Sequence, residues 1–303
     1  MGHVTELALL VPGGHGQLGS ELSTLGTQLG TVRAPGSAEL DITSDTAVRS
    51  AVAELAASPR GRPIVINAAA YTAVDAAETD ESTAHLVNAH GPAVLARACA
   101  EFGVPLIHVS TDYVFDGTAD HPYEPDDPVG PRSVYGATKL AGEQAVLSAT
   151  DTAWVVRTAW IYGSLGNNFV KTMARLEKQR DILSVVDDQR GTPTWTGDLA
   201  VGLLDLAVAI AGDRAPARRV LHRTGAGQTT WFGLARAVFE ELGADPERLK
   251  PCTTAEFPRP APRPAYSVLS DAAWREAGLV AAVPWRAALA TFFATHGAEV
   301  GTD

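Results

Sequence analysis

Short apolar runs alternate with longer segments of helical periodicity along the first half of the chain. Short runs that are apolar throughout, with turn residues on either side, are typical of strands buried on both faces of a parallel sheet. Helices between such strands cover the two faces and produce a doubly wound α/β fold of the Rossmann type. We expect strands at residues 7–11, 30–34, 64–67, 106–110 and 154–158, and helices at about 17–29, 46–57, 83–101 and 135–149.

The pattern is less regular after about residue 160, which predicts a second, smaller region. Helices are expected at 167–180, 198–211, 231–242 and 285–294, and strands at 183–186 and 220–222. The run FPRPAPRP, residues 257–264, has prolines at alternate positions and cannot lie inside a helix. The predicted division is a dinucleotide-binding domain of residues 1–160 with returning segments at about 183–222, and a smaller α/β substrate-binding region of residues 161–182 and 223–303.

Composition and charge exclude several classes of protein. Apolar residues make up 46% of the 303 residues, which is enough material for a substantial core. A net charge of −11 argues against a nucleic-acid partner, because such a partner requires a basic surface. Cys99 and Cys252 are too few for a four-ligand zinc site, and their scarcity favours a reducing cytoplasm. The sequence has neither a signal segment nor an apolar run of membrane-spanning length, so we expect no membrane association.

A glycine-rich turn, PGGHGQLG, follows the first expected strand directly. Gly13, Gly16 and Gly19 stand at the spacing GxxGxxG, which allows a tight turn and a close approach of backbone to a pyrophosphate. The amino end of the following helix offers free N–H groups to the phosphates. We therefore expect a dinucleotide to contact Gly13, Gly16, Gln17 and Leu18.

The end of the second strand bears on which dinucleotide binds. An acidic residue there would accept the ribose hydroxyl of NADH, whereas an arginine suits the 2′-phosphate of NADPH. The expected second strand offers Arg33 and no nearby acid, so the sequence leans toward NADPH, with NADH as the alternative. A solvated surface charge is an equally simple reading of Arg33. Asp41 and Ile42 come later and are expected to border the adenine.

Three polar positions are expected to meet at the same edge of the sheet. Thr111 follows the fourth strand, and Tyr135 and Lys139 stand one helical turn apart at the start of the next helix. Residues just beyond the carboxyl ends of parallel strands share one crevice. A tyrosine and a lysine at this spacing are by themselves weak evidence, but the glycine turn supplies the structural context that such a motif needs.

Longer strings of residues point to one family. GQLGSEL, AAYTAVDAAE, HVSTDYVFDG, YGATKLAGEQAV, VVRTAWIYG, VVDDQRGTPTWTGDLA and RPAYSVLS together resemble the dTDP-4-dehydrorhamnose reductase family of the extended short-chain dehydrogenases/reductases. The resemblance spans residues 7 to about 295. It implies hydride transfer from NADPH or NADH to C4 of dTDP-4-dehydro-L-rhamnose, which gives dTDP-L-rhamnose.

The resemblance also implies roles for individual residues. Tyr135 would be the general acid, and Lys139 would lower its pKa from the ordinary value of about 10 and hold the nicotinamide ribose. Thr111 would hydrogen-bond the ketone oxygen. Ala68, Ala69 and Tyr71 match the segment near the cofactor's ribose and nicotinamide, Asp112 and Tyr113 would contact sugar hydroxyls, Trp160 would form an apolar wall, and Asn168 and Arg190 would lie near the diphosphate.

Several alternatives stay open. Tyr71 and Trp160 could simply pack in the core, and Arg190 could be a surface residue. Another nucleotide-sugar 4-ketoreductase or a 4-epimerase would use the same tyrosine and lysine, and a non-catalytic NADP-binding regulatory subunit would be expected to lack them. Relatives of this kind can form homodimers, in some cases with Mg²⁺, but no acidic cluster in the sequence identifies metal ligands.

Overall fold

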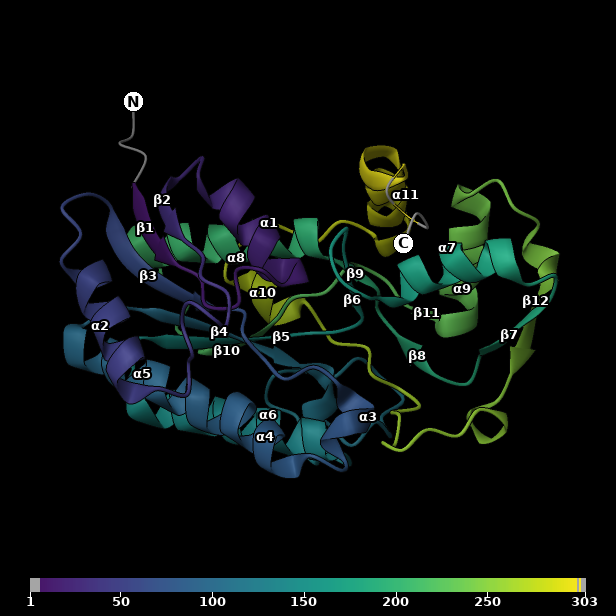
Figure 1. Cartoon of the computed structure of the whole chain (residues 1–303), viewed down its shortest axis with the longest axis horizontal. Coiled ribbons are helices and arrows are strands. Elements are labelled where there is room, and N and C mark those ends of the chain that lie inside the picture. The colour runs from purple at the N-terminus through teal and green to yellow at the C-terminus, as the bar shows by residue number, and fades with distance from the viewer. Residues whose placement is uncertain (1–5, 299, 301–303) are drawn as a thin grey trace.

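A computed structural model describes residues 6–298 and 300. Its centre is a parallel sheet of six strands in the order β10-β5-β4-β3-β1-β2 (Figure 1), which confirms the predicted doubly wound α/β class. The paired registers place the carboxyl ends of neighbouring strands at one edge, since Leu106 pairs with Ala153 and Thr111 with Thr158. The strands are β1 (Leu7–Leu10), β2 (Gly30–Arg33), β3 (Arg62–Asn67), β4 (Leu106–Thr111), β5 (Ala153–Thr158) and β10 (Val220–His222).

Helices cover both faces of this sheet (Figure 1). Alternate residues of each strand point to opposite faces, so Leu9 packs in one apolar cluster and Leu10 in the other. The first cluster includes α1 (Gln17–Gly26), α8 (Thr196–Ala211) and α10 (Ala272–Glu276). The second includes α2 (Asp45–Ala56), α5 (Gly91–Phe102) and α6 (Val134–Ala149). The short helices α3 (Val74–Ala77) and α4 (Glu81–His85) and a π-helical turn, η1 (Leu86–His90), precede α5.

A third apolar cluster forms the core of the smaller part of the molecule, on the right of Figure 1. Its helices are α7 (Phe169–Gln179), α9 (Trp231–Glu241) and α11 (Trp285–His296). Three two-stranded sheets accompany them: β7 (Leu183–Val186) with β12 (Leu249–Cys252), β6 (Ile161–Tyr162) with β9 (Thr194–Trp195), and β8 (Arg190–Gly191) with β11 (Thr229–Thr230). The 3-10 turns are η2 (Asp112–Val114), η3 (Pro246–Arg248) and η4 (Thr254–Glu256).

The chain passes between the two parts more than once. Of the segments at about 183–222, β10 joins the central sheet and α8 packs on one of its faces, whereas β7 pairs with β12 in the smaller part. The predicted domain boundaries stay a prediction. Among the described residues, no helix is both long enough and apolar enough to cross a bilayer.

Candidate active site

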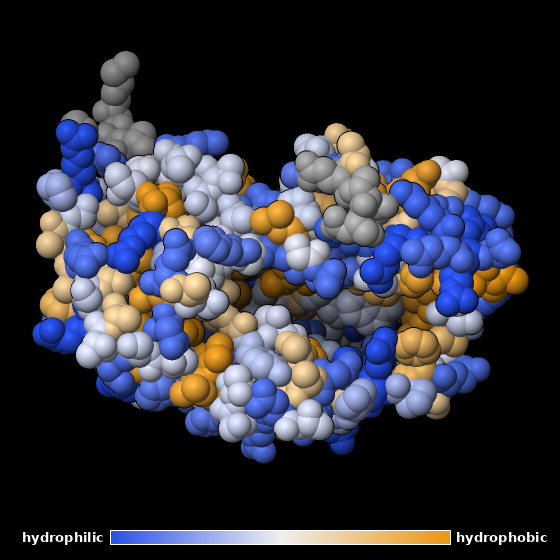
Figure 2. All heavy atoms as spheres, in the orientation of Figure 1, coloured by the Kyte–Doolittle hydropathy of each residue, from blue (hydrophilic) through white to orange (hydrophobic). Residues whose placement is uncertain are grey.

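A cavity of about 890 Å³ lies along the carboxyl ends of the central strands. Figure 2 shows the molecule hollowed between its larger and smaller parts on this side. Most of the residues predicted from the sequence line it. They are Gly13, Gly16, Gln17, Leu18, Asp41, Ile42, Ala68, Ala69, Thr111, Asp112, Tyr113, Tyr135, Lys139 and Trp160.

The glycine turn brings backbone against backbone at the start of the cavity. Gly13 has φ +81°, and a Cβ built there would lie 2.7 Å from the amide nitrogen of Ala69. A Cβ at Gly19 would lie 2.1 Å from the carbonyl oxygen of Gly13, so the turn and α1 can pack this closely only with glycine. Gly16 is the N-cap of α1, and its side of the turn faces the cavity with the free N–H groups of the helix. The cradle therefore fits a dinucleotide pyrophosphate.

Arg33 does not lie where the sequence predicted it, at the end of the cavity expected to hold the adenosine of the cofactor. The Arg33 guanidinium lies 2.7 Å from the Glu54 carboxylate on α2, and Arg33 does not line the cavity. The lean toward NADPH that rested on Arg33 therefore has no support in its position. Asp41 does line the cavity, and hydrogen bonds from the Thr43 backbone and side chain lower its pKa. The sequence interpretation missed His15, which also lines this end and lies 3.4 Å from Glu39.

The predicted catalytic residues lie together in the middle of the cavity. Thr111 ends β4, and its hydroxyl donates to Asp112 at 3.0 Å. Tyr135 lies in the first turn of α6, where the side chain of Ser133 caps the helix by accepting from the Gly136 amide. Lys139 follows one turn later, is 2% exposed, and donates from Nζ to the carbonyl oxygen of Val109 at 2.8 Å. The fold thus brings Thr111, Tyr135 and Lys139 to one place.

Glycine lets α6 approach its neighbours closely. A Cβ at Gly136 would lie 2.2 Å from the carbonyl oxygen of Tyr113, and one at Gly142 would lie 2.1 Å from that of Asn88. The ring of Tyr113 packs edge-on against the ring of Tyr135, with 5.4 Å between centroids. The close approach at Gly136 therefore lets the Tyr113 ring contact the Tyr135 ring and limit its position.

The pKa values in this site follow burial. Burial raises the pKa of Tyr135 to about 12, and a hydrogen bond with Thr111 only partly opposes it. The expectation that Lys139 lowers the pKa of Tyr135 finds no support here, because burial outweighs the other influences on this phenol. Burial also lowers the pKa of Lys139 to about 8, against the nearby charge of Glu143. At neutral pH Tyr135 is therefore a protonated phenol, the form that a general acid needs.

A buried ion pair joins the catalytic helix, α6, to strand β5. Glu143, one turn after Lys139, accepts from Arg157 on β5 at 3.0 Å and 2.8 Å, and both side chains are almost fully buried. The Arg157 guanidinium also lies over the Phe115 ring and donates to the carbonyl oxygen of Pro125. A bidentate pair of this kind fixes the orientation of both side chains.

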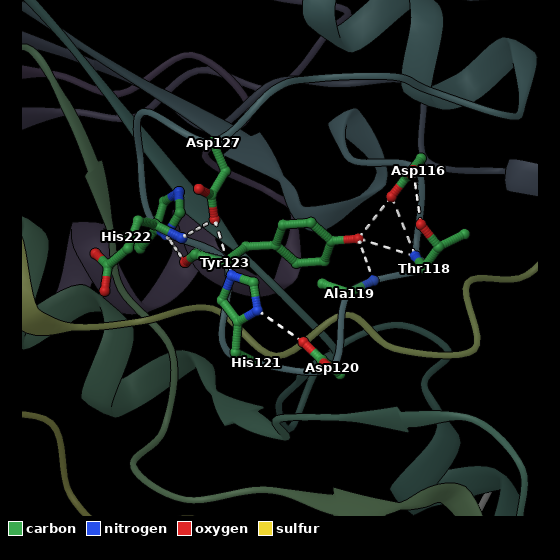
Figure 3. Close-up of polar contacts among 9 residues, drawn as sticks. Asp116, Thr118, Ala119, Asp120, His121, Tyr123, Asp127 and His222 are labelled. Atoms are coloured by element: carbon green, nitrogen blue, oxygen red, sulfur yellow. Dashed lines mark hydrogen bonds and ion pairs between the residues drawn. The ribbon is translucent and has the colours of Figure 1, made fainter.

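The loop between Thr111 and α6 is fixed by its own polar contacts (Figure 3). The hydroxyl of Tyr123 donates to Asp116 at 2.7 Å and accepts from the amides of Thr118 and Ala119. The ring of His222, at the end of β10, donates from Nδ1 to the carbonyl oxygen of Tyr123, and burial lowers the pKa of this histidine to about 3. The loop is therefore tied to the edge of the central sheet.

Two tryptophans mark a boundary inside the cavity. Trp160 adopts φ 47°, a left-handed conformation that is rare for a large side chain. Its ring stacks on that of Trp231 at the start of α9, with 3.6 Å between centroids and 8° between planes. Trp160, Trp231 and Tyr113 also line a second cavity of about 420 Å³ on the side of the smaller part. The sequence interpretation missed Trp231, because nothing in its local pattern links it to Trp160.

Three other predicted residues lie outside both cavities. The Tyr71 amide donates to the side chain of Asn88. Asn168 caps α7, and its side-chain amide donates to Gln17 at 3.0 Å, so it touches a residue that lines the larger cavity. Arg190 is exposed in β8.

No group of three or more His, Cys, Asp or Glu side chains with metal-binding geometry occurs among the described residues. The Mg²⁺ expectation therefore has no support in the part of the chain that the structure describes. Cys99 and Cys252 are unpaired, and Cys99 is fully buried, as expected for a structural thiol.

Comparison with known proteins identifies the family. The family described as RmlD substrate binding domain matches residues 7–297. The chain belongs to this RmlD family. A family member from Streptomyces griseus, named dTDP-4-dehydrorhamnose reductase, is 51% identical over 287 residues, which cover 94% of this chain and 92% of the relative.

Two further relatives of this RmlD chain are informative. One from Streptomyces antibioticus, named a probable dTDP-4,6-dihydroxy-2-methyloxan-3-one 4-ketoreductase, is 50% identical over 289 residues, 94% of each chain. A crystal structure of dTDP-4-dehydrorhamnose reductase from Bacillus anthracis in complex with NADP is 34% identical, with a TM-score of 0.87 over 96% of this chain and 99% of that one. The family and fold predicted from the sequence are confirmed.

Proposed function

We propose that this RmlD-family protein reduces the C4 ketone of dTDP-4-dehydro-L-rhamnose and forms dTDP-L-rhamnose. The observation that carries the proposal is the convergence of Thr111, Tyr135 and Lys139 in the cavity that begins at the glycine turn. The name of the Streptomyces griseus relative supports the choice of substrate.

The cofactor proposed for the larger cavity is NADPH, with NADH as the alternative. When bound, it supplies the hydride for the reduction. The glycine turn and the amino end of α1 would hold the pyrophosphate, and Asp41 and Ile42 would border the adenosine. The Bacillus anthracis relative was solved with NADP, which favours the phosphorylated cofactor.

The protein's own part in the reaction is proton transfer and orientation. The Tyr135 phenol would donate its proton to the C4 oxygen as negative charge develops there. The Thr111 hydroxyl would hydrogen-bond the same oxygen and orient it. Lys139 would bind the cofactor ribose and provide a positive charge beside the reacting groups, and its pKa of about 8 keeps it mostly protonated at neutral pH.

The second cavity is proposed to receive the nucleotide of the substrate. It meets the larger cavity at Trp160 and Trp231, and it is lined partly by apolar side chains and partly by Arg259 and Arg263. An apolar surface suits a base, and guanidinium groups suit a diphosphate.

A paired assay tests this function. The protein is mixed with NADPH or NADH and dTDP-4-dehydro-L-rhamnose, and both cofactor oxidation and sugar product are measured. Stoichiometric oxidation with dTDP-L-rhamnose as product supports the proposal, whereas interconversion of sugars without net oxidation indicates a 4-epimerase. Tyr135→Phe should lower kcat by about 10²- to 10⁴-fold. Turnover that survives within a few-fold in this variant would exclude Tyr135 as the general acid.

An assay with a second ketosugar distinguishes the proposed enzyme from another nucleotide-sugar 4-ketoreductase. The name of the Streptomyces antibioticus relative supports this alternative. A higher kcat/KM for a different dTDP-4-ketosugar would move the assignment to a related 4-ketoreductase. A homodimer and a cytoplasmic location stay predictions, for which size-exclusion chromatography with light scattering and cell fractionation are the measurements.

A further inference from the structure

The proline-rich run, residues 257–264, forms one wall of the second cavity. Phe257, Arg259, Arg263 and Pro264 all line it. Figure 1 shows the chain after β12 returning from the smaller part toward α3. Beyond the run, backbone hydrogen bonds hold the chain, because the Arg190 amide donates to Ala265 and the Tyr266 amide donates to Gly117. The middle of the run lies against α3, because the Ala261 amide donates to Asp75.

Asp75 on α3 holds the middle of this run with both carboxylate oxygens. One oxygen accepts from the amide of Ala261 at 3.2 Å, and the other accepts from the Arg263 guanidinium at 2.9 Å. Arg263 also donates to the carbonyl oxygen of Ala261 at 3.0 Å, which closes a ring of hydrogen bonds. Burial alone would raise the pKa of Asp75, but these hydrogen bonds and the positive charges of Arg263 and Arg259 outweigh it, and the pKa is lowered. The carboxylate is thus charged and fully engaged.

The two arginines of the run are left in different states. The Arg263 guanidinium forms an ion pair with Asp75, and its side chain is only 19% exposed. Arg259 lies over the ring of Phe257, 4.7 Å from its centroid, and has no carboxylate within ion-pair distance among the described residues. Both line the second cavity. The charge of Arg259 is close enough to Asp75 to help lower its pKa, but no ion pair holds the guanidinium among the described residues, so it can bind an anionic ligand in the second cavity.

We propose that Asp75 is a positioning residue for the diphosphate of the substrate. Asp75 itself lines the second cavity, where its carboxylate is paired with Arg263. By fixing Ala261 and Arg263, it holds the proline-rich run over this cavity and keeps Arg259 facing the place where the diphosphate lies. Both arginines line the cavity, but Arg263 is paired with Asp75, so we assign the direct contact with the diphosphate to Arg259. This assignment rests on the proposed function, because it takes a nucleoside diphosphate sugar as the ligand.

The test compares steady-state kinetics of Asp75→Asn with those of the wild type. Loss of a charge-assisted hydrogen bond should raise KM for the ketosugar about tenfold. The value of kcat should stay within about twofold and the affinity for NADPH should be unchanged, because Asp75 does not line the cofactor cavity. Asp75→Glu should restore part of the affinity. Asp45→Asn is the matched control, since it makes the same change in an exposed ion pair with Arg97.

Hydrogen exchange distinguishes the role of the Asp75–Arg263 ion pair from that of Arg259. Asp75→Asn should accelerate amide exchange in the peptide that covers residues 257–266. Arg259→Gln should raise KM about tenfold without changing that exchange, because it removes a ligand contact and leaves the ion pair intact. Arg263→Lys keeps the charge but loses the fork geometry, so it should raise KM and accelerate exchange even if Asp75→Asn fails to fold.

An unchanged KM in a folded Asp75→Asn protein would overturn the proposal and leave the contact a structural tie. An unchanged KM in Arg259→Gln would overturn the role of Arg259. If the wild-type protein does not turn over the ketosugar, the proposed function fails by itself. The role of Asp75 is then read from hydrogen exchange and from thymidine diphosphate binding by calorimetry, where unchanged values in Asp75→Asn would refute it.

Discussion

Asp112 carries a charge in a place that disfavours charge. It is 3% exposed, and burial raises its pKa from 3.8 to about 6, against hydrogen bonding that includes the one from the Thr111 hydroxyl. A carboxyl whose pKa is higher in the folded protein gives stability that is present at low pH and lost as pH rises through about 6. We expect Asp112→Asn to remove this dependence.

The magnitude follows from the two pKa values. Between pH 4.5 and pH 7.5, a shift from 3.8 to about 6 changes the free energy of unfolding by about 2 kcal/mol. The wild type should therefore lose about 2 kcal/mol over this interval relative to Asp112→Asn. Any constant effect of the substitution, such as an altered hydrogen bond with Thr111, cancels when the two pH values are compared.

Urea unfolding followed by tryptophan fluorescence measures this difference at several pH values. Asp151→Asn, at an exposed position, makes the same chemical change on the surface and serves as the control. If the free-energy difference between Asp112→Asn and the wild type is the same at pH 4.5 and pH 7.5, Asp112 has an ordinary pKa in the folded state. The reasoning from burial would then be refuted.

Two further substitutions act on the catalytic helix. Lys139→Met should abolish turnover. From pH 8 to pH 10.5, the free energy of unfolding of the wild type should also rise by about 3 kcal/mol relative to this variant, because the unfolded lysine keeps a proton that the folded lysine, with a pKa of about 8, releases. Urea unfolding measures this difference, and parallel pH curves for the two proteins would contradict the prediction. Glu143→Gln should cost about 3 kcal/mol in the same assay, because it leaves Arg157 buried without its carboxylate, and adding Arg157→Met should recover part of the loss.

The sequence pattern predicted the central sheet because its inner strands, such as β1 and β3, are largely apolar on both faces. It also predicted the meeting of Thr111, Tyr135 and Lys139, because parallel strands end at one edge and the helical spacing is fixed. Both features depend on local pattern and on general rules of topology. They needed no knowledge of distant contacts.

Side-chain partners far along the chain could not be predicted in this way. Arg33 is bound by Glu54, and Trp231 stacks on Trp160, although neither pairing follows from periodicity. The pKa of Tyr135 depends on how completely the folded protein excludes water from the phenol, and burial is a property of packing. Sequence spacing alone suggested the opposite direction.

The late position of α8 and β10 in the chain has a consequence for synthesis on the ribosome. Strands β1 to β5 are complete at Thr158, yet one face of their sheet is covered partly by α8, and the edge beside β5 is filled only by Val220–His222. During translation, apolar residues of β1 and β3 on that face therefore stay exposed until α8 has been synthesised. The nascent amino-terminal half is expected to be a client of chaperones until α8 emerges.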